Sequence, residues 1–219
     1  MLLREQASTM LSLQMSMNAK VDPDWLAARY PYLRAVAIEG AEAIEHHGWK
    51  WWKKQEKDLP QLQMELIDIW HFILSEILLR NSGNVDASLA ALMILLDSAN
   101  TQKIIDFDDQ QYSIDELDLL TKLELLIALS VVRRIELSLF QSIMSKCQIG
   151  WLDLYRQYVG KNVLNMFRQD HGYKDGSYQK IWNGREDNEY LVEIIDSLDP
   201  NQAKFKDQVY IALKSSYPA

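Results

Sequence analysis

Apolar residues recur every three or four positions along most of the chain, a spacing that predicts amphipathic α-helices. Asp22, Pro23 and Asp24 are a helix-start signal, because aspartate caps a helix and proline fits its first turn. The helix that begins there is expected to break near Pro31 and to end near His47. The other predicted helices cover about 2–17, 60–80, 85–98, 114–147, 151–169 and 200–215. The pattern therefore predicts an all-α helical bundle, formed by a single domain over 1–219.

The segments between these helices are polar. We expect loops at 48–59 and 100–113, and an irregular segment at 171–188 that contains Gly172, Gly176 and Gly184. Glycine leaves the backbone loose, and the basic residues of this segment need an anion to hold them. The segment 171–188 is therefore predicted to be mobile and to close over a bound ligand.

The helix predicted at 60–80 has two different faces. One face is apolar, and the other is acidic and aromatic, with Glu65, Asp68, Phe72, Glu76 and Leu79 at steps of three and four. No Lys or Arg occurs from 59 to 79, whereas an ordinary solvated face mixes both signs of charge. The spacing by itself leaves two interpretations about equally open: a solvated acidic face or a metal site.

Two acidic pairs share one spacing. Glu39 and Glu42 are three residues apart on one predicted helix, and Glu65 and Asp68 are three apart on the next. Residues at this spacing lie on one face of a helix, so two such helices can direct four carboxylates to one place. Four clustered carboxylates repel one another unless cations neutralise them. Oxygen-only ligands suit hard ions, which makes Mg²⁺ the first candidate and Mn²⁺ the second.

Fixed positive charge is concentrated late in the chain. Lys161 and Arg168 share a helix face with Asn165 between them, and Lys174, Lys180 and Arg185 follow. Arg and Lys bind phosphates, and Asn can offer both a donor and an acceptor to a base edge. Nucleotide binding is one interpretation, and a surface helix paired with the protein's own acids is the other.

Composition excludes some classes of protein. The formal net charge of −8 and the pI of about 5.0 argue against non-specific nucleic-acid binding, which needs a basic surface. Cys147 is the single cysteine, so no internal disulfide can form and a reducing compartment is expected. We recognise no signal peptide and no apolar run of membrane-spanning length. The expectation is a cytoplasmic protein with no membrane partner.

Several motifs resemble those of the dimeric all-α dUTPases, a branch of the all-α NTP pyrophosphatases that is related to MazG-like enzymes. The acidic pairs alone indicate only the wider superfamily. More specific are WKWWK at 49–53, GKNVLNMFR at 160–168, HGYK at 171–174 and GREDN at 184–188. The resemblance covers 39–188 and raises the metal-site interpretation well above the solvated face. Residues 81–150 match no motif of the family.

The resemblance implies a reaction in which dUTP, and also dUDP, is hydrolysed to dUMP in the presence of Mg²⁺. It implies Glu39, Glu42, Glu65 and Asp68 as metal ligands, with Glu39 or Glu42 as the general base. Phe72 would lie under the deoxyribose and exclude a 2′-hydroxyl. The remaining implied substrate contacts are Gln14, Asn18 and Trp49 at the base, Lys161, Arg168, Tyr173, Lys174 and Lys180 at the phosphates, and Asn162, Asn165 and Asn188 at the nucleoside or its phosphates.

Three further expectations follow. His71 is expected to be a packed or hydrogen-bonded histidine, since Mg²⁺ prefers oxygen ligands. A homodimer is expected, because the leucines between Leu117 and Ile143 cannot all share one helix face. Two alternative functions stay open at this point: hydrolysis of another nucleoside triphosphate such as dCTP, and a catalytically inactive dimeric interaction protein.

Overall fold

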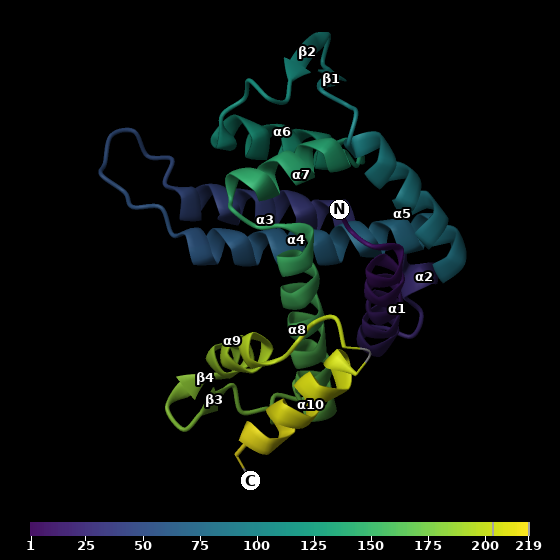
Figure 1. Ribbon diagram of the computed structural model, residues 1–219, viewed down its shortest axis with the longest axis vertical. Helices are drawn as coiled ribbons and strands as arrows, with labels where there is room; N and C mark the ends of the chain where they lie inside the picture. Colours follow the sequence, from purple (N-terminus) through teal and green to yellow (C-terminus); the bar gives the residue numbers. More distant parts are fainter. Residues whose placement is uncertain (203, 219) are drawn as a thin grey trace.

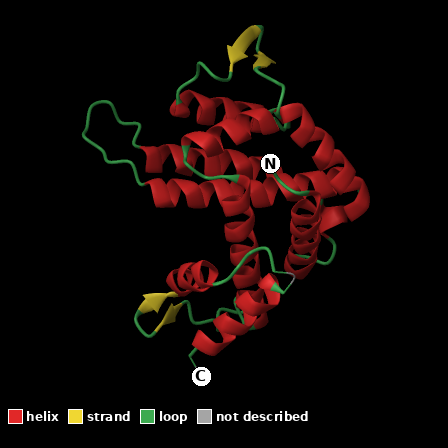
Figure 2. Ribbon diagram, viewed as in Figure 1, coloured by secondary structure: helices red, strands yellow, loops and turns green. Residues whose placement is uncertain are grey.

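The computed structural model describes residues 1–202 and 204–218 of the chain. Within these ranges the protein consists of ten α-helices and two very short β-hairpins (Figures 1 and 2). The helices are α1 (Arg4–Val21), α2 (Trp25–Ala28), α3 (Tyr32–His47), α4 (Leu59–Arg80), α5 (Val85–Ala99), α6 (Leu119–Val131), α7 (Leu137–Lys146), α8 (Trp151–Asp170), α9 (Asp187–Ser197) and α10 (Phe205–Ser216). The hairpins pair β1 (Ile104–Phe107) with β2 (Gln110–Ser113), and β3 (Ile181–Trp182) with β4 (Arg185–Glu186). The predicted all-α fold is confirmed.

Local sequence explains where the central helices begin. The side chain of Asp58 accepts a hydrogen bond from the Gln61 amide, and Pro60 lies in the first turn of α4. Asn84 and Asp118 cap α5 and α6 in the same way. These side chains satisfy amide groups that have no partner within the helix, which stabilises each start by about 1 kcal/mol.

Helices α3 and α4 lie side by side, and α6 packs along α3 on its other side (Figure 1). Gly40 permits this close approach, because a Cβ atom there would lie 2.8 Å from Cγ1 of Ile127 on α6. Such a distance is too short for a carbon contact, so a side chain at 40 would push α6 away. Glu39 and Glu42 flank this glycine, and the packing of α6 therefore fixes the part of α3 that carries them.

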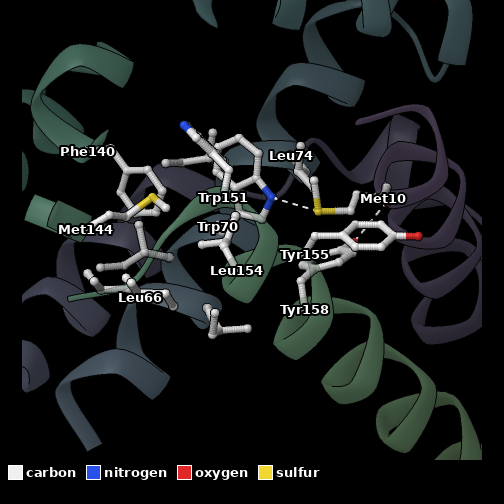
Figure 3. Close-up of a cluster of buried hydrophobic side chains, with 14 of the residues drawn as sticks. Met10, Leu66, Trp70, Leu74, Phe140, Met144, Trp151, Leu154, Tyr155 and Tyr158 are labelled. Atoms are coloured by element: carbon white, nitrogen blue, oxygen red, sulfur yellow. Dashed lines mark hydrogen bonds between the residues drawn. The ribbon is translucent and has the colours of Figure 1, made fainter. Parts of the chain in front are cut away.

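The core lies where α1, α4, α7 and α8 meet, and Figure 3 shows its centre. Trp70 stacks on Phe140 with ring centroids 5.5 Å apart, and it meets Trp151 edge-on at 5.4 Å. Its indole nitrogen also donates to the sulfur of Met10 at 3.3 Å. Large buried rings contribute strongly to stability, so this cluster holds α8 firmly against α4.

Most helix predictions are confirmed, including the break near Pro31, where α2 ends and α3 begins. Three were wrong. The stretch 114–147 forms two helices, separated by a turn in which Arg133 has a left-handed φ of 66°. The predicted loop at 100–113 contains the hairpin β1–β2. The irregular segment ends at the helix α9, which was not predicted, and the last helix starts at Phe205; residue 203 lies outside the described residues.

The leucine-rich stretch does not by itself call for a dimer interface, and the homodimer stays a prediction. Leu119, Leu123, Leu125, Leu126 and Leu129 are all buried within the chain itself. They can be buried on more than one face because α6 packs between α3 on one side and α7 on another. These leucines are therefore accounted for without a second subunit. Among the described residues, no helix is both long and apolar enough to cross a membrane.

Candidate active site

An acidic cluster lies between α3 and α4. Glu39, Glu42 and Glu65 each place a carboxylate oxygen within 4.8 Å of the others. Glu65 is buried, Glu39 is half-buried and Glu42 is exposed, so the cluster opens to solvent on one side. The predicted fourth member, Asp68, lies outside this group of three and accepts a hydrogen bond of 2.5 Å from Nζ of Lys161.

The acidic side chains perturb one another. Burial, reinforced by the negative charge of Asp68 and of Glu42, raises the pKa of Glu39 to about 7. Burial and the same two neighbours raise the pKa of Glu65 to about 7. The Nε2 atom of His46 lies 3.3 Å from a Glu65 oxygen, a contact that the sequence reasoning missed. Both pKa shifts arise from burial and from repulsion between neighbouring carboxylates.

A large pocket of about 860 Å³ opens beside the cluster, bounded by α1, α2, α3, α4 and α8. Glu39 and Asp68 lie on its wall, so the acids and the pocket form one site. The structure brings eight of the predicted site residues to this wall: Gln14, Asn18, Glu39, Asp68, Phe72, Lys161, Asn165 and Arg168. These residues are up to 154 positions apart in the sequence, counted from Gln14 to Arg168.

The inner wall of the pocket carries a set of buried amide and hydroxyl groups. Nε2 of Gln14 donates to Oδ1 of Asn18 and to Oγ of Ser75, both at 2.9 Å. Tyr158, which is fully buried, donates to Oε1 of Gln14 at 2.8 Å. Nδ2 of Asn18 is buried and has no hydrogen-bond partner in the described part of the chain. Buried polar atoms are rarely left unpaired, so this nitrogen points to a missing partner.

His71 carries a second buried atom of this kind. Its Nδ1 atom donates to the Ile67 carbonyl at 2.8 Å, which leaves Nε2 as an acceptor. Nε2 has no partner within the described residues, and His71 lines the pocket. Burial lowers the pKa of His71 to about 4, so the ring is neutral at pH 7. The expectation of a hydrogen-bonded histidine is confirmed, and the free acceptor beside the pocket was missed.

Arg168 is held by a partner that the sequence reasoning did not identify. Its Nε and Nη2 atoms donate to the two oxygens of Asp187 at 2.8 Å, and Nη1 donates to Asn165 at 3.2 Å. Asp187 is fully buried and also accepts from the Tyr178 hydroxyl at 2.8 Å. Although burial raises the pKa of Asp187, the bonds from Arg168 and Tyr178 hold it below its usual value. Asp187 is the fourth residue of the GREDN motif at 184–188, so this motif could have indicated it.

Several predicted substrate residues do not line the pocket. The Trp49 indole donates to Oε1 of Glu45 at 2.7 Å and contacts Trp51 and Trp52, and Trp51 is 86% exposed. This loop projects from the bundle between α3 and α4 (Figure 1). The position of Trp49 in this structure is therefore at the rim of the bundle, away from the wall that holds Gln14 and Asn18.

The predicted phosphate-binding residues after α8 do not line the pocket either. Tyr173 and Lys174 are exposed. Hydrogen bonds from Tyr30 and the Asp24 amide lower the pKa of Asp22 on the pocket wall, and the charge of Lys174 adds slightly to this shift. Lys180 pairs with Glu186 at 3.3 Å, on the hairpin β3–β4. Asn188 accepts a long bond of 3.4 Å from Arg168.

Asn162 does not line the large pocket. It is fully buried at a separate cavity of about 210 Å³ between α1, α8 and α10. Residues 161 and 162 are adjacent on α8, and neighbouring side chains of a helix point about 100° apart, so the two face different cavities. Lys161 reaches the substrate-sized pocket and Asn162 does not, so the prediction that both contact the nucleotide finds no support in this geometry.

The fold and the site define the class of this protein: an all-α bundle in which two adjacent helices carry an acidic cluster beside a deep, amide-lined pocket. A family model with the description dUTPase matches residues 6–173. This range covers well over half of the chain, so the chain belongs to this all-α dUTPase family. The resemblance found in its motifs is thereby confirmed, and a dUTPase-like activity on nucleotides is indicated. A comparison with curated proteins finds no match.

Proposed function

We propose that this protein is a dUTP diphosphatase that converts dUTP, and also dUDP, to dUMP. The observation that carries the proposal is that one pocket brings three features together. Unpaired hydrogen-bonding atoms of Asn18 and His71 and the cations Lys161 and Arg168 lie on its wall, and the acidic cluster lies beside it. A volume of about 860 Å³ is large enough for a nucleotide. The volume of the pocket, its unpaired hydrogen-bonding atoms and the neighbouring acids are thus compatible with the substrate that the family suggests.

The acidic cluster fits a divalent cation of the Mg²⁺ or Mn²⁺ type. Its donors are all carboxylate oxygens, the ligands that these hard ions prefer. The raised pKa values of Glu39 and Glu65 reflect repulsion and burial that a bound cation would relieve. Glu39, Glu42 and Glu65 would hold the metal, and Asp68 would join them by turning from Lys161. When bound, such an ion neutralises phosphate charge and makes a coordinated water acidic.

The base would enter at the inner wall, where Asn18 and His71 lie. Nδ2 of Asn18 is a free donor and Nε2 of His71 is a free acceptor. A uracil ring offers a carbonyl oxygen next to an N–H group along one edge, and this pair of groups complements them. Cytosine offers an amino group next to an unprotonated nitrogen at that edge, and would leave both protein groups opposed. This pairing favours dUTP over dCTP as the substrate.

The sugar and phosphates would extend from the base toward the acids. Phe72 lies on the pocket wall, one position after His71 and four after Asp68 on α4, where a packed ring would refuse a 2′-hydroxyl. Lys161 and Arg168 on α8 would neutralise phosphate oxygens, and Lys174, Tyr173 and Lys180 would approach from the following segment. Glu39 or Glu42 would take the proton of the attacking water.

A phosphate-release assay coupled to inorganic pyrophosphatase tests the proposal. The purified protein is supplied with dUTP, dUDP, dCTP, dTTP and UTP, with Mg²⁺, with Mn²⁺ and with chelator. We expect hydrolysis of dUTP that needs the metal and is much faster than hydrolysis of dCTP. Faster turnover of another triphosphate would transfer the proposal to that substrate. No metal-dependent hydrolysis of any of them would instead favour an inactive interaction protein.

A further inference from the structure

A chain of hydrogen bonds runs behind the pocket wall from α8 to α1. It begins at the hydroxyl of Tyr158, passes to Oε1 of Gln14 at 2.8 Å, and continues from Nε2 of Gln14 to Oδ1 of Asn18 at 2.9 Å. Tyr158 does not line the pocket and is fully buried, whereas Gln14 and Asn18 do line it. The chain therefore connects a residue that cannot touch a substrate with two that can.

Ser75 fixes the direction of this chain from the other side. Its hydroxyl lies 2.9 Å from the His71 carbonyl and 3.2 Å from Oδ1 of Asn18, so its proton goes to one of these acceptors and its oxygen is left to accept from Nε2 of Gln14, at 2.9 Å. The amide nitrogen of Gln14 thus faces Ser75 and Asn18, and the amide oxygen faces Tyr158. The Tyr158 hydroxyl lies 2.8 Å from this oxygen and 3.0 Å from the Met10 carbonyl, and its proton at the shorter distance satisfies a buried amide oxygen that would be unfavourable without a donor.

The direction of the chain decides what Asn18 presents to a ligand. Because Oδ1 of Asn18 is occupied by Gln14, only Nδ2 is unpaired. Reversal of the Gln14 amide would require Asn18 to turn as well, and its oxygen would then be the free group. A free amide nitrogen binds a carbonyl oxygen, whereas a free amide oxygen binds an amino group. That difference separates uracil from cytosine.

We propose that Tyr158 is a positioning residue that sets the base preference of the site by holding the Gln14 and Asn18 amides in one orientation. This inference rests on the proposed uracil nucleotide substrate and adds a determinant that lies outside the pocket. Without the Tyr158 hydroxyl, the Gln14 oxygen can turn to accept from Ser75, whose hydroxyl proton would then leave the His71 carbonyl. Asn18 would then follow, and its oxygen would face the base.

Tyr158→Phe tests the inference, since it removes the hydroxyl and keeps the ring that packs 4.3 Å from the His71 ring. The measurement is the ratio of kcat/KM for dUTP to kcat/KM for dCTP. We expect this ratio to fall at least about tenfold. The site rejects cytosine only while the Gln14 and Asn18 amides are held in the orientation that matches uracil. We expect the dCTP value itself to rise, which general loss of packing would not cause.

A matched control is present on the same helix. Tyr155 is also buried and lies beside Tyr158 in the core (Figure 3), but among the described residues it makes no hydrogen bond to Gln14, Asn18 or Ser75. Tyr155→Phe should leave the ratio unchanged. Ser75→Ala removes the other group that fixes Gln14, and should lower the ratio in the same direction. Thermal melts show which variants are folded, and Ser75→Ala carries the test if Tyr158→Phe is not.

The outcomes separate the two proposals. A wild-type protein that does not hydrolyse dUTP would overturn the proposed function and this inference with it. An active wild-type protein whose dUTP-to-dCTP ratio is the same in folded Tyr158→Phe or Ser75→Ala would overturn the inference alone. A ratio that falls equally in Tyr155→Phe would also overturn it, since the effect would then belong to core packing.

Discussion

At the acidic cluster, we expect each carboxylate to support activity and to reduce the stability of the metal-free protein. We predict that Glu39→Gln, Glu42→Gln, Glu65→Gln and Asp68→Asn each lower the turnover of dUTP at least about a hundredfold, because each removes a charge and an oxygen ligand. Metal-dependent hydrolysis at saturating Mg²⁺ measures the loss. Glu136→Gln is a suitable control, since Glu136 pairs with Arg134, remote in sequence from the cluster. Near-normal turnover in two of the four variants would refute the assignment.

The same substitutions should stabilise the protein when no metal is present. Glu39 and Glu65 bind protons more tightly in the folded chain, at pKa values of about 7, than in the unfolded chain near 4.5. The folded state therefore holds extra protons between these values, and its stability falls as the pH rises from about 4.5 to about 7. Urea unfolding in chelator should show this fall for the wild type and a smaller fall for Glu39→Gln and Glu65→Gln. Stability that rises over this interval would contradict the shifts.

Phe72 is the residue expected to select the sugar. It is half-buried on the pocket wall, one position after His71. We predict that Phe72→Ala narrows the preference for dUTP over UTP, because the smaller side chain leaves room for a 2′-hydroxyl. The measured quantity is the ratio of the two kcat/KM values. An unchanged ratio with lower stability would mean that Phe72 serves only to pack α4.

At the scale of elements, the segment 171–188 is anchored at some points and free at others. Tyr178 stacks on Tyr217 of the C-terminal region at 5.5 Å, and Trp182 is fully buried. Three stretches beside these anchors are exposed: 173–177 before Tyr178, 179–181 between the two anchors, and 183–184 after Trp182. The predicted mobility is therefore expected to be confined to these exposed stretches, with Arg168 and Asp187 holding the ends of the segment together.

Hydrogen exchange tests this behaviour. We predict that 173–177 exchanges faster than α4 in the free protein and becomes protected when a non-hydrolysable dUTP analogue and Mg²⁺ bind, because phosphate would hold Lys174. Lys174→Ala should then lower kcat as well as raise KM, and Lys146→Ala on the exposed side of α7 should change neither. Equal protection with and without the analogue would show that the segment is a fixed wall.

For the whole molecule, we predict a homodimer, as the resemblance to dimeric all-α dUTPases implies. The buried leucines of α6 no longer support it, but other apolar side chains remain uncovered. Ile38 on α3, Ile94 on α5, and Val131 and Val132 at the end of α6 are each more than half exposed. Light scattering at micromolar concentration should give twice the mass of 25.5 kDa. A monomer would refute the prediction, and Ile94→Glu or Val131→Glu would locate the interface if the dimer dissociates.

The sequence by itself determined most of the helices, many of their boundaries and the two acidic pairs from which the cluster is built. Helical periodicity and capping are local properties, so α4 could be predicted from Pro60 to Arg80 almost as it is observed. The spacing of Glu39 from Glu42, and of Glu65 from Asp68, likewise follows from the geometry of a helix alone. Motifs then indicated the family, and the family model confirmed it.

Only the tertiary structure decided which of these residues meet, because contacts between distant segments depend on how helices pack and not on their own periodicity. Gly40 lets α6 press on α3, Asp187 from α9 holds Arg168, and Tyr158 from α8 orients Gln14 on α1. Each of these pairs joins residues that share no local pattern. Burial also depends on tertiary structure, because every element packed around a side chain helps to cover it. The pKa of a histidine or a carboxylate, and the number of its hydrogen-bonding atoms left without a partner, therefore depend on the whole fold.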